Sequence, residues 1–266
     1  MIRNLPVLSP VFALLACMFA VPAAIAQAPS GAERQQELLQ VWYQIREEVA
    51  DNGDVEAKYD VGVANFIARG TSKDKDRAAT WFQRAADRGH AGAHYYLGYI
   101  YAAGDGRDAD PVKSQQHYLR AAELGHADAQ YLIGLRYANG EGLPRDGTEA
   151  AKWMSRAADK GVAAAQFYMG QLREVGRPGE VRPDTAAAMD LYREAANQGH
   201  VPAQNRLGEL YSAGRGGIRR DLEEAYLWFS LAENQERVDE VGRRMSRGQL
   251  ATANDRVEAR LAELVR

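Results

Sequence analysis

An internal repeat of about 36 residues constrains this chain more than any other feature. Four segments align without gaps, YYLGYIYAAGDG (95–106), YLIGLRYANGEG (131–142), FYMGQLREVGRP (167–178) and NRLGELYSAGRG (205–216), and YDVGVANFIARG (59–70) is a weaker copy. One glycine is shared by all five copies, at spacings of 36, 36, 36 and 38 residues: Gly62, Gly98, Gly134, Gly170 and Gly208. A period of this length predicts an array of stacked structural units.

Each unit is expected to form two antiparallel helices. In the first half, alanines and larger apolar residues recur at helical spacing. Glycine inside a helix costs about 1 kcal/mol of stability relative to alanine. Its presence at one position in all five units therefore predicts that the backbone of the paired helix approaches closely there. The second half of every unit begins with an aspartate that we expect to cap the second helix: Asp74, Asp110, Asp146, Asp184 and Asp221.

The combined pattern, A-x-A-Q-x-x-L-G-x-x-Y followed by D-x-x-x-A-x-x-W-x-x-x-A-A-x-x-G, resembles the Sel-one-like (Sel1-like) repeat, a relative of the tetratricopeptide repeat. The units are 54–90, 91–126, 127–162, 163–200 and 201–236. Units one and four depart from the pattern, with Asn65 and Arg173 at the tyrosine position. The resemblance implies an all-α, right-handed α-solenoid of five two-helix repeats, from the cysteine-free branch of the family.

The flanking segments fit terminal caps, which arrays need to cover the apolar faces of their last units. Residues 27–53 are predicted to form an N-terminal capping helix, with Leu38, Trp42, Ile45 and Val49 on the face that meets the array. Residues 237–266 are predicted to form C-terminal capping helices, the last of which starts at Ser246.

Residues 1–26 have the features of a signal peptide: Arg3, the apolar run 11–20, and the small-residue site Ala24-Ile25-Ala26. We therefore expect cleavage near Ala26 and a periplasmic or secreted protein. Cys17 is the only cysteine, and a lipoprotein anchored through it is the alternative. No later stretch is apolar enough to span a bilayer, so no transmembrane segment is expected in the mature chain.

Catalytic and nucleic-acid-binding functions find little support. The net charge of −3 gives no overall basic character for holding nucleic acid. Common hydrolase, zinc-protease, redox and phosphate-loop motifs are absent from the sequence. His90, His126 and His200 follow the glycines that end each unit, which places them in different layers of the array. We therefore expect no enzyme activity, no metal and no cofactor.

Binding is better supported, because the first helices of such units line the concave face of a solenoid. Counted from the first alanine of each unit, the fifth and ninth positions form the candidate partner-binding set: Tyr59, Tyr95, Tyr131, Phe167, Asn205, Tyr99, Leu135, Gln171 and Glu209. Tyrosines at a surface are typical interface anchors. The alternative is that the fifth-position aromatics only pack against their neighbours. Two basic patches, 215–220 and 243–247, could also hold an acidic partner or an anionic polymer, or could simply be solvated.

These observations favour an exported scaffold or adaptor that binds another protein through its concave face. Two alternatives remain open: a regulatory subunit that binds a membrane sensor or an envelope complex, and a peptidoglycan- or polymer-binding protein or hydrolase. The family resemblance implies roles in envelope complex assembly, signalling or host interaction, without choosing among them.

Overall fold

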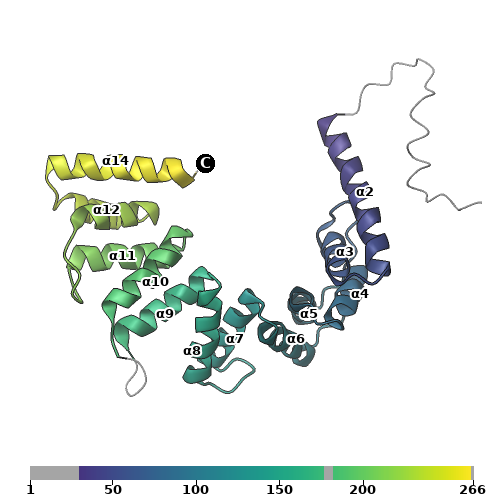
Figure 1. Cartoon of the computed structure of the whole chain (residues 1–266). Coiled ribbons are helices and arrows are strands. Elements are labelled where there is room, and N and C mark those ends of the chain that lie inside the picture. The colour runs from purple at the N-terminus through teal and green to yellow at the C-terminus, as the bar shows by residue number, and fades with distance from the viewer. Residues whose placement is uncertain (1–29, 177–181, 265–266) are drawn as a thin grey trace, which may run out of the picture.

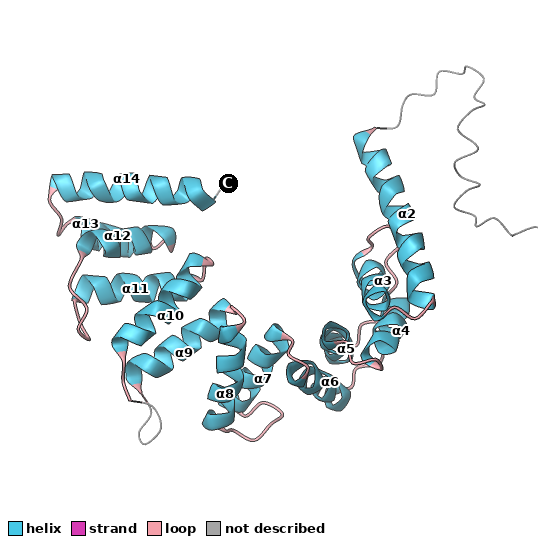
Figure 2. Cartoon of the chain, in the orientation of Figure 1, coloured by secondary structure: helices cyan, strands magenta, loops and turns pink. Residues whose placement is uncertain are grey.

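The computed structural model of the chain describes residues 30–176 and 182–264. These residues form thirteen α-helices, labelled α2 to α14, and no strand (Figures 1 and 2). The predicted signal peptide, its cleavage site and Cys17 lie outside the described residues. The predicted all-α solenoid is confirmed.

Ten of the helices form five consecutive antiparallel pairs, one pair for each sequence repeat. We call the first helix of a pair helix A and the second helix B. The pairs are Val55–Ile67 (α3) with Lys75–Ala86 (α4), Ala91–Ala103 (α5) with Pro111–Glu123 (α6), Ala127–Asn139 (α7) with Gly147–Asp159 (α8), Ala163–Val175 (α9) with Thr185–Asn197 (α10), and Val201–Ala213 (α11) with Leu222–Leu231 (α12). The flanking helices are Gly31–Asp51 (α2), Gln235–Gly242 (α13) and Arg247–Leu264 (α14).

The stacked pairs curve, so that α2 and α14 form the two arms of an open arc (Figure 1). In this view the A helices α3, α5 and α7 lie on the inner side of the arc, and their partners α4, α6 and α8 lie on the outer side. The buried apolar side chains form a series of small clusters, about one per unit, as expected when each repeat contacts only its neighbours.

The shared glycines sit where a ring or a methionine of helix B presses on helix A. A Cβ on Gly98 would lie 2.8 Å from the Tyr118 ring, and one on Gly170 would lie 2.5 Å from the Tyr192 ring. Phe82, Met154 and Phe229 occupy the same place in the other units. The sequence correctly predicted a close approach of helix B to the shared glycine. The prediction that the backbone of helix B makes this contact was wrong, because a large side chain of helix B lies against the glycine in every unit.

Side-chain caps hold the start of every B helix and of four of the five A helices. The five aspartates accept hydrogen bonds from backbone N–H groups in the first turn of their B helices, as Asp146 does from Thr148 and Glu149. Histidines cap three of the A helices through Nδ1: His90, His126 and His200. The sequence marked these histidines only as a repeated position, and capping is their structural reason. Val162 replaces the histidine in unit four and provides no side-chain cap.

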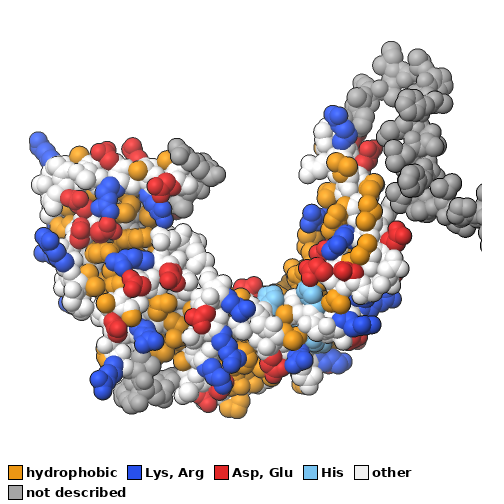
Figure 3. Space-filling view, in the orientation of Figure 1, with side chains coloured by type: hydrophobic (Ala, Val, Ile, Leu, Met, Phe, Trp, Pro, Cys, Tyr) orange, Lys and Arg blue, Asp and Glu red, His pale blue; other side chains and the backbone are white. Residues whose placement is uncertain are grey.

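Helix α2 packs on the array with a different face from the one predicted. Tyr43 and Ala50 are buried against α3, and Tyr43 accepts a hydrogen bond from the buried Asn65 amide (3.0 Å). Of the predicted apolar stripe, Trp42 packs at the edge of this buried cluster. Leu38 and Ile45 instead face solvent, 71% and 52% exposed, and Figure 3 shows apolar side chains along this helix. Ion pairs between α2 and the first unit, including Arg46 with Asp60, fix this rotation of the helix.

Candidate protein-binding face

The fifth-position aromatics of the A helices are half-buried and contact the cap of the next unit. Tyr59 stacks on His90 at a centroid distance of 4.3 Å, and Tyr95 stacks on His126 at 4.5 Å. Burial, with the neighbouring Tyr96 and carboxylates, raises the pKa of Tyr59 to about 12. These rings therefore contribute to packing between units, and only part of each reaches the surface.

The remaining fifth positions vary along the array. Phe167 approaches His200 at 5.0 Å and packs against the Tyr192 ring, while Tyr131 is half-buried beside the cluster that contains Met154. Asn205 accepts a 2.6 Å hydrogen bond from the side chain of Asn234. The aromatic series thus ends in a polar residue in unit five.

The ninth positions are more accessible. Tyr99 is 45% exposed, with its ring edge-on to Phe66 at 5.8 Å, and Gln171 is exposed on α9. Leu135 and Glu209 are half-buried. Among the predicted residues, a partner can therefore reach mainly Tyr99, Gln171 and the polar residues of unit five, Asn205 and Glu209.

Four of the nine predicted residues meet in one hollow of about 340 Å³ between α9 and α11, which we call the A-face hollow. Phe167, Gln171, Asn205 and Glu209 line it, together with Glu174 and Arg206. Its volume lies in the lower part of the range for pockets that hold small ligands or single side chains. The five remaining predicted residues belong to units one to three and lie along the same row of A helices.

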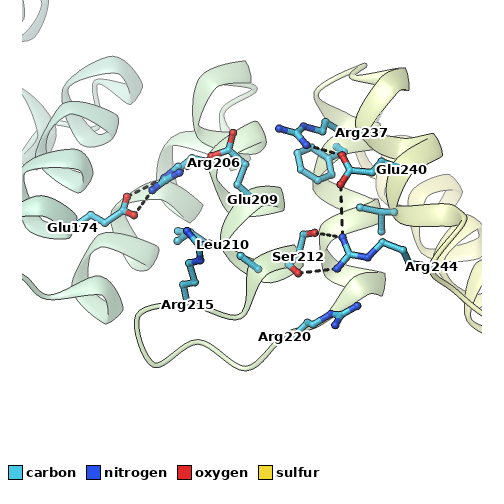
Figure 4. A pocket seen from close by; sticks show the side chains of 13 residues that line it. Glu174, Arg206, Glu209, Leu210, Ser212, Arg215, Arg220, Arg237, Glu240 and Arg244 are labelled. Carbon is cyan, nitrogen blue, oxygen red and sulfur yellow. Dashed lines mark hydrogen bonds and ion pairs between the residues drawn. The ribbon is translucent and has the colours of Figure 1, made fainter.

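A second, larger hollow of about 600 Å³ lies between α11, the loop after it and α13 (Figure 4). Its lining carries five guanidinium groups, Arg206, Arg215, Arg220, Arg237 and Arg244, so we call it the arginine hollow. Three carboxylates, Glu174, Glu209 and Glu240, lie around them, and Leu210, Phe229 and Val241 supply apolar lining. The sequence marked the arginines of 215–220 and 243–247 as two patches; the fold brings members of both into one site.

The two hollows share an ion-pair network. The Nε of Arg206 donates to Glu174 at 3.0 Å and one of its Nη atoms donates to the other oxygen of that carboxylate, while the other Nη donates to Glu209 at 2.5 Å. Burial works to raise the pKa of Glu174, but hydrogen bonds from Arg206 and Tyr192 outweigh it and lower that pKa. Glu174, Arg206 and Glu209 therefore line both hollows, and Arg206 is held in place by the two carboxylates.

The histidines of unit two form a separate pair. His94 Nδ1 and His117 Nδ1 lie 3.0 Å apart, and the Tyr101 ring stacks on His117 at 5.5 Å. Burial, reinforced by the charges of His94 and Lys113 and opposed by Asp87, lowers the pKa of His117 to about 4. His117 stands where units one, three and five have Trp81, Trp153 and Trp228, and this position thus holds a neutral, stacked imidazole.

In residues 30–176 and 182–264 no three His, Cys, Asp or Glu side chains are grouped so that they could hold a metal ion. None of the described helices is both long enough and apolar enough to cross a membrane.

Comparison with known proteins supports the repeat assignment. A family model for the Sel1 repeat matches residues 55–90, 91–126, 127–162, 163–200 and 201–236. A crystal structure of a Sel1 repeat protein from Oxalobacter formigenes is 33% identical, with 74% of this chain and 79% of that chain covered and a TM-score of 0.65. A protective antigen of uropathogenic Escherichia coli with an SLR fold is 25% identical, with 86% and 57% covered and a TM-score of 0.59. No curated protein matches the sequence.

Sel1 repeats generally act as protein-interaction scaffolds. The five matched units span most of the described residues and coincide with the five helix pairs. The chain therefore belongs to the Sel1 repeat family.

Proposed function

We propose that this protein is a non-catalytic scaffold or adaptor that binds a partner protein along the row of A helices. The observation that carries the proposal is the A-face hollow, where Phe167, Gln171, Asn205 and Glu209 converge from two successive units. Tyr99 extends the row toward the N-terminus with an exposed ring. An extended surface with repeated aromatic and polar contacts suits a protein or peptide better than a small substrate.

The finer proposal is that the scaffold works outside the cytoplasm, as a periplasmic or secreted protein. The apolar run 11–20 and the Ala24-Ile25-Ala26 site support export. The absence of cysteine from residues 27–266 leaves packing, caps and ion pairs as the source of stability in an oxidising compartment. Fractionation of cells that express the full chain, with N-terminal sequencing of the exported form, tests this part: a cytosolic protein that keeps residues 1–26 would refute it.

The binding proposal is tested by photo-crosslinking in cells from single positions. A photoreactive residue replaces Tyr99 or Gln171 on the A helices, and matched control sites are Gln116 on α6 and Ala186 on α10, which are exposed on B helices. Crosslinked species are identified by mass spectrometry. We expect one dominant protein partner from both A-helix positions and a much weaker signal from the controls.

Equal labelling from the A- and B-helix positions would contradict the proposal, because a binding face must differ from the opposite surface. A crosslink to glycan rather than to protein would favour the polymer-binding alternative.

A further inference from the structure

We infer that the arginine hollow binds an acidic segment of the partner protein, a short stretch that carries two or more carboxylates. The inference rests on the proposed function, because it assigns a chemistry to the C-terminal end of the same interaction surface. It starts from a charge imbalance: five guanidinium groups meet three carboxylates in the lining of one hollow.

The pairing of these groups leaves two arginines free to bind. Arg206 is held by Glu174 and Glu209, and Arg237 donates to Glu240 at 2.6 Å. Arg244 donates to the hydroxyl and the carbonyl of Ser212 and lies 3.9 Å from Glu240. Among the described residues, no carboxylate lies within ion-pair distance of Arg215 or Arg220, and Figure 4 shows both side chains at the loop edge of the hollow.

The loop that carries Arg215 and Arg220 is anchored at both ends and in the middle. Gly214 ends α11 in the left-handed conformation (φ 65°), and Asp221, which caps α12, donates its backbone N–H to the Tyr211 carbonyl (3.0 Å). Between them the half-buried Ile218 packs against the core of units four and five. The two free guanidinium groups are therefore presented from a positioned loop, which lowers the entropic cost of ordering them on binding.

The shape and charge of the hollow favour a peptide carboxylate over a membrane or a polymer. Guanidinium forks match carboxylates in two-point hydrogen bonding. The two unpaired guanidinium groups are gathered at one concave site, whereas an anionic bilayer or a nucleic acid backbone is held by an extended basic surface. A concave site with two unpaired cations suits a few carboxylates at the right spacing.

Fluorescence anisotropy on the mature chain, residues 27–266, tests the inference with a fluorescein-labelled hexaglutamate peptide. The test variant is Arg215→Glu with Arg220→Glu, and the control is Arg88→Glu with Arg145→Glu, which makes the same change in net charge at two exposed arginines outside the hollow. Hexaglutamine and vesicles of phosphatidylglycerol are run beside it. Circular dichroism checks that both double variants keep the wild-type helix content.

We expect hexaglutamate to bind the wild-type and control proteins, and the test variant to lose at least about tenfold in affinity, as is typical when close charge pairs are removed. Hexaglutamine should not bind. Three results would each overturn the inference: no hexaglutamate binding up to about 1 mM, equal weakening in both double variants, or vesicle binding that depends on Arg215 and Arg220 without peptide binding.

The outcome can be separated from that of the proposed function. Crosslinks from Tyr99 and Gln171 to a protein, combined with no hexaglutamate binding, would remove the inference and leave the scaffold in place. Arginine-dependent hexaglutamate binding without any A-face crosslink would instead contradict the proposed binding row while keeping the acidic site.

Discussion

Replacing Gly170 with alanine should destabilise the protein, although alanine is the better helix former. A Cβ at this position would lie 2.5 and 2.7 Å from two ring atoms of Tyr192, which is wholly buried. The ring is also tied through its hydroxyl to Glu174 at 2.8 Å, so it cannot move without breaking that hydrogen bond. The added methyl group of Gly170→Ala therefore clashes with the Tyr192 ring, which is fixed both by its burial and by its hydroxyl hydrogen bond.

The magnitude follows from three opposing contributions. Forcing a methyl group into a packed interface costs about 1–3 kcal/mol, and losing the tyrosine hydrogen bond costs about 1 kcal/mol. Alanine returns about 1 kcal/mol in helix propensity. The net loss of about 1–3 kcal/mol should lower the melting temperature by roughly 2–4 °C per kcal/mol in a chain of this size.

Two alanine variants control for the propensity gain. At Gly134 the Cβ would meet the buried Met154, at 2.9 Å from its Cγ and 3.1 Å from its Cε, and a thioether side chain adapts more readily than a ring. Gly134→Ala should thus lose less stability than Gly170→Ala. Gly248→Ala, at a helical position with open space around it, should be neutral or stabilising.

Urea unfolding followed by circular dichroism measures all three variants under one set of conditions. A Gly170→Ala protein as stable as wild type would contradict the expected clash with Tyr192, and so would a larger loss of stability in Gly134→Ala than in Gly170→Ala.

Three further predictions test the caps, the face and the histidine pair. Asp146→Ala should cost about 1 kcal/mol in urea unfolding, since two first-turn N–H groups lose their acceptor, and Asp146→Asn should recover most of it. Tyr95→Ala should cost about 1–3 kcal/mol because the ring is half-buried and stacked, whereas Tyr99→Ala should stay within about 0.5 kcal/mol; equal losses would contradict the burial difference. The pKa of His117 lies below its ordinary 6.5, at about 4, so the unfolded chain takes up the proton first as pH falls. Stability should be complete above about pH 6.5 and decline toward pH 4, by about 1–2 kcal/mol once solvent screening of the half-exposed ring is allowed for. His117→Gln should flatten this decline, and an unchanged pH profile would remove the histidine pair, with His94, from the explanation.

The fold was predictable because its determinants are local and repeated five times. A glycine or an aspartate at one place in every unit makes the same packing or capping contact five times, so the sequence pattern alone predicts that contact. Helix bounds follow from it: α6 begins at Pro111, directly after its cap Asp110. The identity of the group that presses on Gly98 was not predictable, because the helix crossing that points Tyr118 at it is a tertiary property.

The rotation of α2 could not be predicted for a related reason. Its sequence has two candidate faces, the aliphatic stripe through Leu38 and Ile45 and the mixed face through Tyr43 and Ala50. The first unit offers Asp60 and the buried Asn65 as polar partners, and these select the mixed face. Hydrophobic periodicity alone gives no weight to such partners.

The candidate site was predictable only in part. Counting positions along the repeat placed Gln171 and Glu209 on one surface, and the A-face hollow brings them together. The same counting could not tell that the Tyr59 and Tyr95 rings would be half-covered by His90 and His126, since that contact joins successive units. Nor could counting positions predict that Arg215 and Arg220 of the loop line the same hollow as Arg237 of α13.

Binding of a partner along the A helices would show itself in the affinity of variants altered on that face. We would measure, by isothermal titration calorimetry, the dissociation constant of the partner captured in cells for three proteins: wild type, Tyr99→Glu with Gln171→Glu, and Gln116→Glu with Ala186→Glu. The two variants carry the same added charge at exposed sites on A and B helices respectively. We predict at least about tenfold weaker binding for the A-helix variant and wild-type affinity for the B-helix variant; the reverse order, or no loss in either, would contradict binding along the A helices.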